Sequence, residues 1–196
     1  MSYKDLYEYC QTLSVPVSRS HVKTKIAELS PHGNGIRIVK STLNPELVQG
    51  YFLSAQNLQH RIVQQCGGAH VIVVARHLNY CWERFVVIKE LMHLFDGQLD
   101  ATNAPQEFET LLNEFTNDPG TRSPQMRAEI ACFWMAIGIM CPEQLRLDLQ
   151  RQISARTITD MDVAEMLKMP VAYVPALFNA NYKANIAKFM KRGART

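Results

Sequence analysis

A continuous apolar run at residues 70–75 (HVIVVA) constrains the fold of this chain more than any other feature. A short, β-branched run without alternation is typical of a strand buried on both faces, so we expect it at the centre of a sheet. Three other short runs precede it, separated by Asn, Pro and Gly signals, at residues 36–40, 51–55 and 60–64. Together the four runs predict one small sheet.

Helices are expected on both sides of these strands in the sequence. Two short helices are predicted before them. From about residue 82 the apolar residues recur with helical spacing, and they cover most of the helix surface, so this helix should be buried on most sides. A stop is expected at Gly97, and Thr159 with Asp162 resembles a capping box. The order of elements predicts an α+β fold. The predicted helices outside the segment at 82–96 cover residues 4–13, 20–29, 105–116, 126–140, 143–153, 160–169 and 171–182.

Charge, cysteine content and hydropathy exclude few classes of function. The formal net charge of +3 neither demands nor excludes a nucleic-acid partner. Five scattered cysteines form no C-x-x-C pair, so we expect reduced, mostly buried thiols. The chain has no run of the ~20 apolar residues that a membrane span needs, and its start lacks the layout of a signal peptide. We therefore expect a cytoplasmic protein with no membrane partner.

Residues 85–96 (FVVIKELMHLFD) nearly spell His-Glu-x-x-His, with Lys89 in the first position, then Glu90 and His93. In the complete motif, residues four apart share one face of a helix, so two histidines bind one zinc ion and the Glu acts on its water. A lysine ammonium has three donors and no lone pair to offer a metal. The segment is therefore a metal site that lacks one ligand, a site that works differently, or a buried helix.

Glu129 supports the second of these readings. It lies at the edge of a helix whose interior, from Ile130 to Cys141, has no charge, and a buried carboxylate is costly unless something compensates it. We hypothesise that the ammonium of Lys89 lies between Glu129 and Glu90, where a metal would lie. Two alternatives remain open: Lys89 extends to solvent at the helix edge, or His93 is a satisfied core histidine.

Three segments carry a resemblance to a known family. Residues 82–97 (WERFVVIKELMHLFDG) resemble the R-R-F-T-x-A-H-E-x-G-H segment of the ImmA/IrrE family of small intracellular metallopeptidases. Residues 128–145 (AEIACFWMAIGIMCPEQL) resemble that family's downstream helix with its ligand Glu, and residues 158–178 resemble its terminal helical piece. The departures are Lys89 for His, Met92 for Gly, and a long excursion between the two helices.

The resemblance implies a small sheet packed on a zincin-like helix pair. It implies His93 and Glu129 as metal ligands, Glu90 as general base, zinc as the metal, and a DNA-binding repressor as the substrate. The expected organisation is an N-terminal helical segment at residues 1–30, a metallopeptidase-like domain with a helical C-terminal part at 31–182, and a basic tail at 183–196. The tail is expected to fray.

Because Lys89 replaces a ligand, we favour a non-catalytic relative that has no cofactor and binds a protein partner, a repressor or other regulator in a phage, mobile-element or stress circuit. The first alternative is an active zinc peptidase, and a separate one is metal binding through His93, Glu129 and a histidine from elsewhere, such as His70 or His77. A further alternative is DNA binding through residues 160–178, although this segment contains Pro175 and its second helix has no Arg or Lys before Lys183. We expect an apolar stripe there to be packing: Ala164, Leu167, Val171, Val174 and Leu177.

Overall fold

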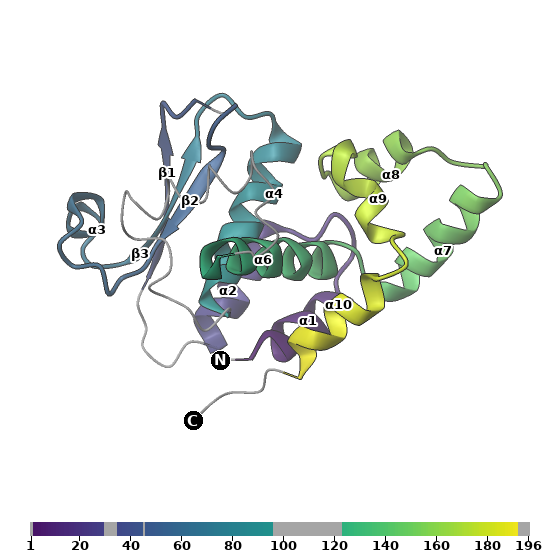
Figure 1. The fold of residues 1–196 in the computed structure, drawn as a ribbon, viewed down its shortest axis with the longest axis horizontal. Helices are drawn as coiled ribbons and strands as arrows, with labels where there is room; N and C mark the ends of the chain where they lie inside the picture. Colours follow the sequence, from purple (N-terminus) through teal and green to yellow (C-terminus); the bar gives the residue numbers. More distant parts are fainter. Residues whose placement is uncertain (1, 30–34, 45, 96–122, 192–196) are drawn as a thin grey trace.

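The computed structural model describes residues 2–29, 35–44, 46–95 and 123–191. The predicted stop at Gly97 and the predicted helix at 105–116 lie outside the described residues. Within them the fold is α+β, with a three-stranded sheet and helices before and after it in the sequence (Figure 1).

The sheet consists of β1 (Ile36–Ser41), β2 (Gly50–Leu53) and β3 (His70–Ala75), in the order β1-β3-β2. β1 pairs with β3 in parallel, and β2 pairs with β3 antiparallel. The side chains from Val71 to Ala75 are all buried, which confirms the prediction that the apolar run is the central strand.

The prediction of a strand at residues 60–64 is wrong, because α3 (Arg61–Gln65) occupies this stretch. His60 caps the helix, since its side chain accepts a hydrogen bond from the backbone N–H of Ile62. Gly67 and Gly68 both adopt positive φ values, 70° and 73°, and turn the chain towards β3. The helix cap at one end and the glycine turn at the other therefore outweighed the strand preference of two β-branched residues.

The two faces of the sheet pack on different helices. One face contributes Ile36, Phe52, Ile72 and Val74 to the main core, which it shares with α4 (Tyr80–Leu91). The other face forms a smaller apolar cluster that includes Val63 of α3. Figure 1 shows α3 and α4 on opposite sides of the sheet.

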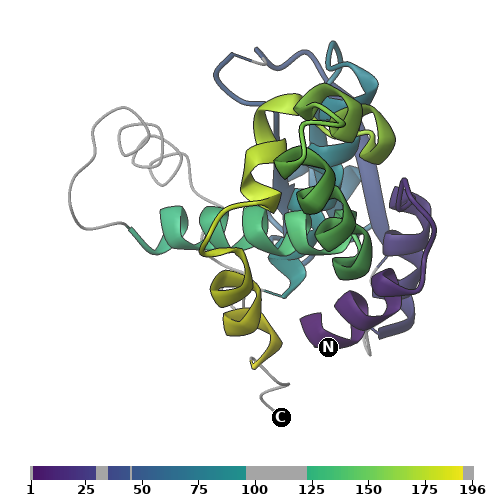
Figure 2. The same cartoon turned by 90° about the vertical axis from the view of Figure 1, so that its right-hand side faces the viewer.

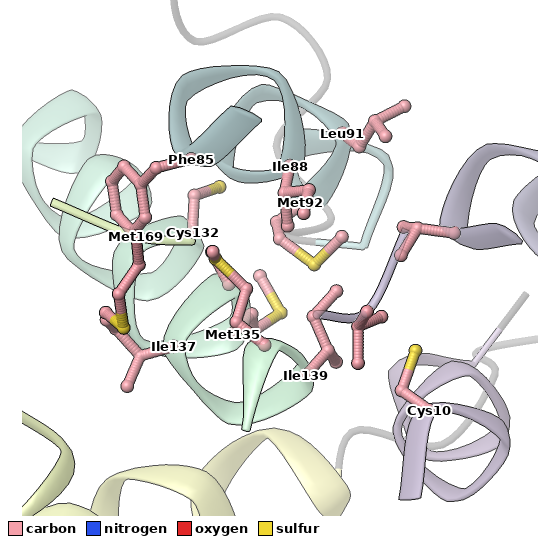
Figure 3. Packing of buried hydrophobic residues seen from close by; sticks show 14 of the residues in the cluster. Cys10, Phe85, Ile88, Leu91, Met92, Cys132, Met135, Ile137, Ile139 and Met169 are labelled. Atoms are coloured by element: carbon pink, nitrogen blue, oxygen red, sulfur yellow. The ribbon is translucent and has the colours of Figure 1, made fainter. Parts of the chain in front are cut away.

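The main core lies between α4 and α6 (Pro124–Met140), as Figure 3 shows. Ile88 and Met92 point from the α4 segment towards Cys132 and Met135 of α6, and all four are fully buried. α4 continues as a 3-10 turn, η1 (Met92–Leu94). The predicted enclosure of this helix is confirmed, because most of its side chains are buried.

The N-terminal helices are part of the same core. α1 (Tyr3–Gln11) packs on α6 and α2 (Arg19–Leu29) packs on α4. Their predicted ranges agree with the structure to within two residues. The five cysteines are all free thiols, three of them buried, as expected.

The C-terminal helices are α7 (Glu143–Ser154), α8 (Asp160–Leu167), the 3-10 turn η2 (Val171–Tyr173), α9 (Val174–Leu177) and α10 (Tyr182–Met190). The predicted capping box of Thr159 and Asp162 is present at the start of α8. Among the described residues, no single helix meets the length and apolarity of a membrane span; only α6 and α7 taken together do, and they meet at a bend of 87°.

The chain after Lys183 does not fray at its start, contrary to expectation. It is helical to Met190, and Ile186 and Phe189 are buried. α10 contacts both α1 and α6, and Figure 2 shows α1 and α10 below α6. The apolar spacing within the basic segment is the reason, since it gives α10 a face that the core covers. Residues 192–196 lie outside the described residues.

Candidate functional site

Four side chains from two helices form what we call the polar site: Lys89, Glu90, His93 and Glu129. Lys89 and Glu90 lie in the last turn of α4, His93 lies in η1, and Glu129 lies on α6. The side chains of Glu90 and His93 are 1% and 5% exposed, while those of Lys89 and Glu129 are 18% and 15% exposed. The site is therefore closed at Glu90 and reaches solvent on the side of Lys89 and Glu129.

The ammonium of Lys89 lies between the two carboxylates. Its Nζ donates a hydrogen bond to Oε2 of Glu129 and lies 2.8 Å from Oε1 of Glu90. His93 contacts the other oxygen of each carboxylate, since its Nε2 lies 3.2 Å from Oε1 of Glu129 and 3.4 Å from Oε2 of Glu90. All four residues singled out by the sequence analysis are thus brought together, and the Lys89 ammonium is bound inside the site rather than held in solvent.

The charges of the site stabilise each other. Burial alone would lower the pKa of Lys89, but the negative charges of Glu129 and Glu90 outweigh it and raise this pKa well above its usual range. Burial would raise the pKa of Glu129, but the charge of Lys89 and the contact with His93 outweigh it and lower this pKa well below its usual range. Lys89 and Glu129 are therefore both charged at neutral pH.

The carboxylate of Glu90 is the least satisfied group of the site. Within the described part of the chain, neither of its oxygens accepts a hydrogen bond of normal geometry, although Lys89 lies close to Oε1. Potential ligand atoms of Glu90, His93 and Glu129 lie within 4.8 Å of one another, as a metal site requires. A divalent ion would compete with the Lys89 ammonium for both carboxylates and be repelled by it, so the residues fit a resident zinc ion poorly.

The two alternative histidine ligands lie outside this group. His77 is exposed beyond the end of β3. His70 lies on the other side of Phe52, whose ring stacks on His93 at a centroid distance of 5.8 Å and on His70 at 5.5 Å. Nδ1 of His70 accepts a hydrogen bond from the backbone N–H of Ala55 at 3.0 Å. His70 therefore has a structural role in the loop after β2.

Phe52 and Tyr173 adjoin the polar site and were not singled out from the sequence. Phe52 covers one face of the His93 ring from β2. Burial raises the pKa of Tyr173, and the charge of Lys89 acts in the opposite direction. No local pattern indicates Tyr173, which reaches α4 from a 3-10 turn more than eighty residues later.

The segment considered for DNA binding does not form two regular helices. After α8 the chain makes η2, the four-residue α9 and then a break before α10. The expected packing role is confirmed for Ala164, Leu167, Val174 and Leu177, which are buried. It is wrong for Val171, which is 42% exposed because it starts η2 directly after Pro170.

Comparisons with known proteins give no family for this chain: no family model matches it, and searches of curated proteins and of solved structures find no match. Function is therefore inferred from the geometry of the polar site and from the motif that its residues form.

Proposed function

We propose that this protein is a non-catalytic, zincin-like relative of the ImmA/IrrE metallopeptidases, which binds a protein partner in the cytoplasm, a transcriptional repressor or other regulator. The observation that carries this proposal is the position of Lys89, whose ammonium is bound by Glu129 and lies 2.8 Å from Glu90. A cation fixed to the chain thus has the place that an exchangeable ion has in a metallopeptidase.

The arrangement around the site supports the zincin-like assignment. α4 carries Lys89 and Glu90, its 3-10 continuation η1 carries His93, and α6, packed against both, supplies Glu129. An antiparallel edge strand, β2, lies beside the first helix and contacts His93 through Phe52. The family resemblance implies a small sheet packed on such a helix pair.

The chemistry of the site supports binding over hydrolysis. A zinc ion lowers the pKa of its bound water and polarises a carbonyl, but an ammonium has no empty coordination position with which to bind water as a ligand. Glu90, the general base of an active relative, lies in an ion pair with Lys89. The charged groups then have a structural role: they connect α4 to α6 and keep the site in shape, but they do not hydrolyse peptides.

The free edge of β2 offers a place for the partner. The backbone N–H of Ala75 donates to the carbonyl of Gln49, so the backbone groups of Gln49, Tyr51 and Leu53 point towards β3. Those of Gly50 and Phe52 point the other way, and among the described residues no strand pairs with that edge. An extended segment of a partner protein can add a strand there, beside the polar site.

Metal analysis of protein purified without chelator tests the proposal. We expect the native chain to contain no stoichiometric zinc and to leave peptides uncut. Lys89→His should bind about one zinc per chain, because it restores the second histidine of the helix, while the matched Lys89→Met should bind none. Stoichiometric zinc in the native chain that is lost in His93→Ala would establish the alternative, an active zinc peptidase, which the clustering of Glu90, His93 and Glu129 favours.

A further inference from the structure

Aromatic residues continue the polar site along the facing sides of α4 and α6, where Phe85 and Phe133 are in ring contact. On α4, Trp82 and Phe85 precede Lys89 by seven and four positions, so the three share one face of the helix. On α6, Phe133 follows Glu129 by four positions and shares its face. The same two helix faces therefore carry the charges at one end and aromatic rings at the other.

Tyr173 joins these rings into one unit. Its ring centroid lies 4.6 Å from Phe85, 5.2 Å from Phe133 and 5.2 Å from Trp82. We call these four residues the aromatic wall. Phe85 is buried, whereas Trp82, Phe133 and Tyr173 keep partly exposed surface. Partly exposed aromatic rings beside a polar centre are typical of binding surfaces, where Trp and Tyr supply most of the affinity.

Within the described residues, two of the three donors of the Lys89 ammonium are used, which leaves one for a ligand. Of its three N–H groups, two face Glu129 and Glu90, and the side chain is 18% exposed. The carboxylates of Glu129 and Glu90 both lie against this ammonium, so its positive charge is already balanced. This charge balance favours a neutral acceptor, such as a backbone carbonyl, and disfavours an anionic group.

We propose that the aromatic wall selects the partner segment, an extended peptide that places a backbone carbonyl on Lys89 and an apolar, preferably aromatic, side chain against Trp82, Phe133 and Tyr173. This inference rests on the proposed function and adds the chemistry of the partner to it. The peptide is held without being cut, because an ammonium cannot coordinate a water and lower its pKa as a metal ion does.

Binding of defined peptides to the full chain tests this. The probes are fluorescein-labelled, end-capped peptides of alternating Thr and Val that differ only in a central Phe, Leu, Ala or Asp. We expect fluorescence anisotropy to give affinities in the order Phe, Leu, Ala, Asp, with about tenfold between Phe and Ala. No binding of any probe, or equal affinity for Phe and Ala, would overturn the inference.

Variants of the wall separate selection from folding. Tyr173→Ala should remove the preference for Phe over Ala, and Tyr173→Phe should keep it. Tyr80→Ala is the matched control, because Tyr80 lies on the same helix, is 61% exposed and is not part of the wall. If Tyr173→Ala does not fold, Trp82→Ala at the edge of the wall is the replacement. If the folded wall variant still prefers the Phe peptide to the Ala peptide, the inference is wrong.

The proposed function fails by a different observation. Zinc in the native chain, or cleavage of the probes seen by mass spectrometry, contradicts the non-catalytic assignment whatever the peptide preference. A metal-free chain that leaves the probes intact but does not distinguish Phe from Ala contradicts only the selectivity of the wall.

Discussion

The ammonium of Lys89 on α4 donates a hydrogen bond to the carboxylate of Glu129 on α6, forty residues later in the chain. Either charge would destabilise the fold without the other, since both side chains are largely buried. The pair also joins the two helices that enclose the core, so its charges determine both the chemistry of the site and part of its stability.

Replacing Lys89 by Met should lower the free energy of unfolding at neutral pH by about 3 kcal/mol, because two buried carboxylates lose their cation. The loss should also become smaller as the pH falls below neutrality. In the variant, protonation relieves the repulsion between Glu90 and Glu129, so stability should rise as the pH falls from 8 to 5. Urea denaturation across this range measures it, and a variant that is destabilised equally at every pH would contradict the assigned charges.

At alkaline pH the native protein, rather than the variant, should show the change in the free energy of unfolding. The folded pKa of Lys89 is raised, so its contribution is complete below the unfolded value of about 10.4 and is lost as the pH rises above it. Lys89→Met lacks this loss. The difference in unfolding free energy between the two proteins should therefore shrink above about pH 10.4.

Glu129→Gln should flatten the acid limb of the stability curve. The folded pKa of Glu129 is lowered, so its contribution is complete above the unfolded value of about 4.3 and is lost as the pH falls below it. Between pH 4 and 2 the native protein should lose about 1.4 kcal/mol more per pH unit than the variant. Glu165→Gln, a change of an exposed carboxylate on α8, should leave the native slope unchanged.

The elements that the sequence predicted well are those whose local signals agree. The apolar run of β3, the charge-free interior of α6 and the capping box at Thr159 each point to one structure, and each is observed. α3 was mistaken for a strand because a segment of five residues is too short for periodicity to decide between helix and strand. α10 was mistaken for a frayed tail because its lysines obscured the spacing of Ile186 and Phe189.

The polar site could be predicted from the sequence for a physical reason. Glu90 and His93 share a helix, and an isolated carboxylate such as Glu129 at the edge of a charge-free helix demands a cation. The contacts of Phe52 and Tyr173 were not accessible, because they depend on how a strand and a distant 3-10 turn pack around α4. Residues separated by 41 and 84 positions from His93 and Lys89 carry no local signal of such contacts.

Arg84→Lys should destabilise the protein by about 3 kcal/mol. The guanidinium of Arg84 is buried and donates to the carbonyls of Val17, Leu167 and Lys168, which lie in two distant segments. Burial lowers the pKa of Arg84 to about 10, so it remains charged at neutral pH. A lysine ammonium lacks the planar fork that reaches three carbonyls. Thermal unfolding measures the loss, and Arg151→Lys on the surface of α7 should change stability by less than about 0.5 kcal/mol.

Gly138→Ala on α6 should reverse the usual benefit of alanine in a helix. In an exposed helix this change stabilises by about 1 kcal/mol. Here the added Cβ would lie 2.7 Å from Oη of Tyr3 and 2.8 Å from Cδ1 of Ile186, so the ends of both side chains would have to move. Overpacking of this kind costs about 1–3 kcal/mol, and the Tyr3 hydroxyl cannot easily yield because it donates to the carbonyl of Met135 at 2.9 Å.

A double-mutant cycle with Tyr3→Phe identifies which contact resists the alanine. Removing the hydroxyl takes away the closest atom, while the flexible end of Ile186 can rotate aside. Gly138→Ala should therefore cost at least about 0.5 kcal/mol less in the Tyr3→Phe background than in the native chain, a coupling that denaturant titration of the four proteins resolves. Strict additivity would mean that α1 does not approach α6 through this hydroxyl, and that α10 alone limits the space at Gly138.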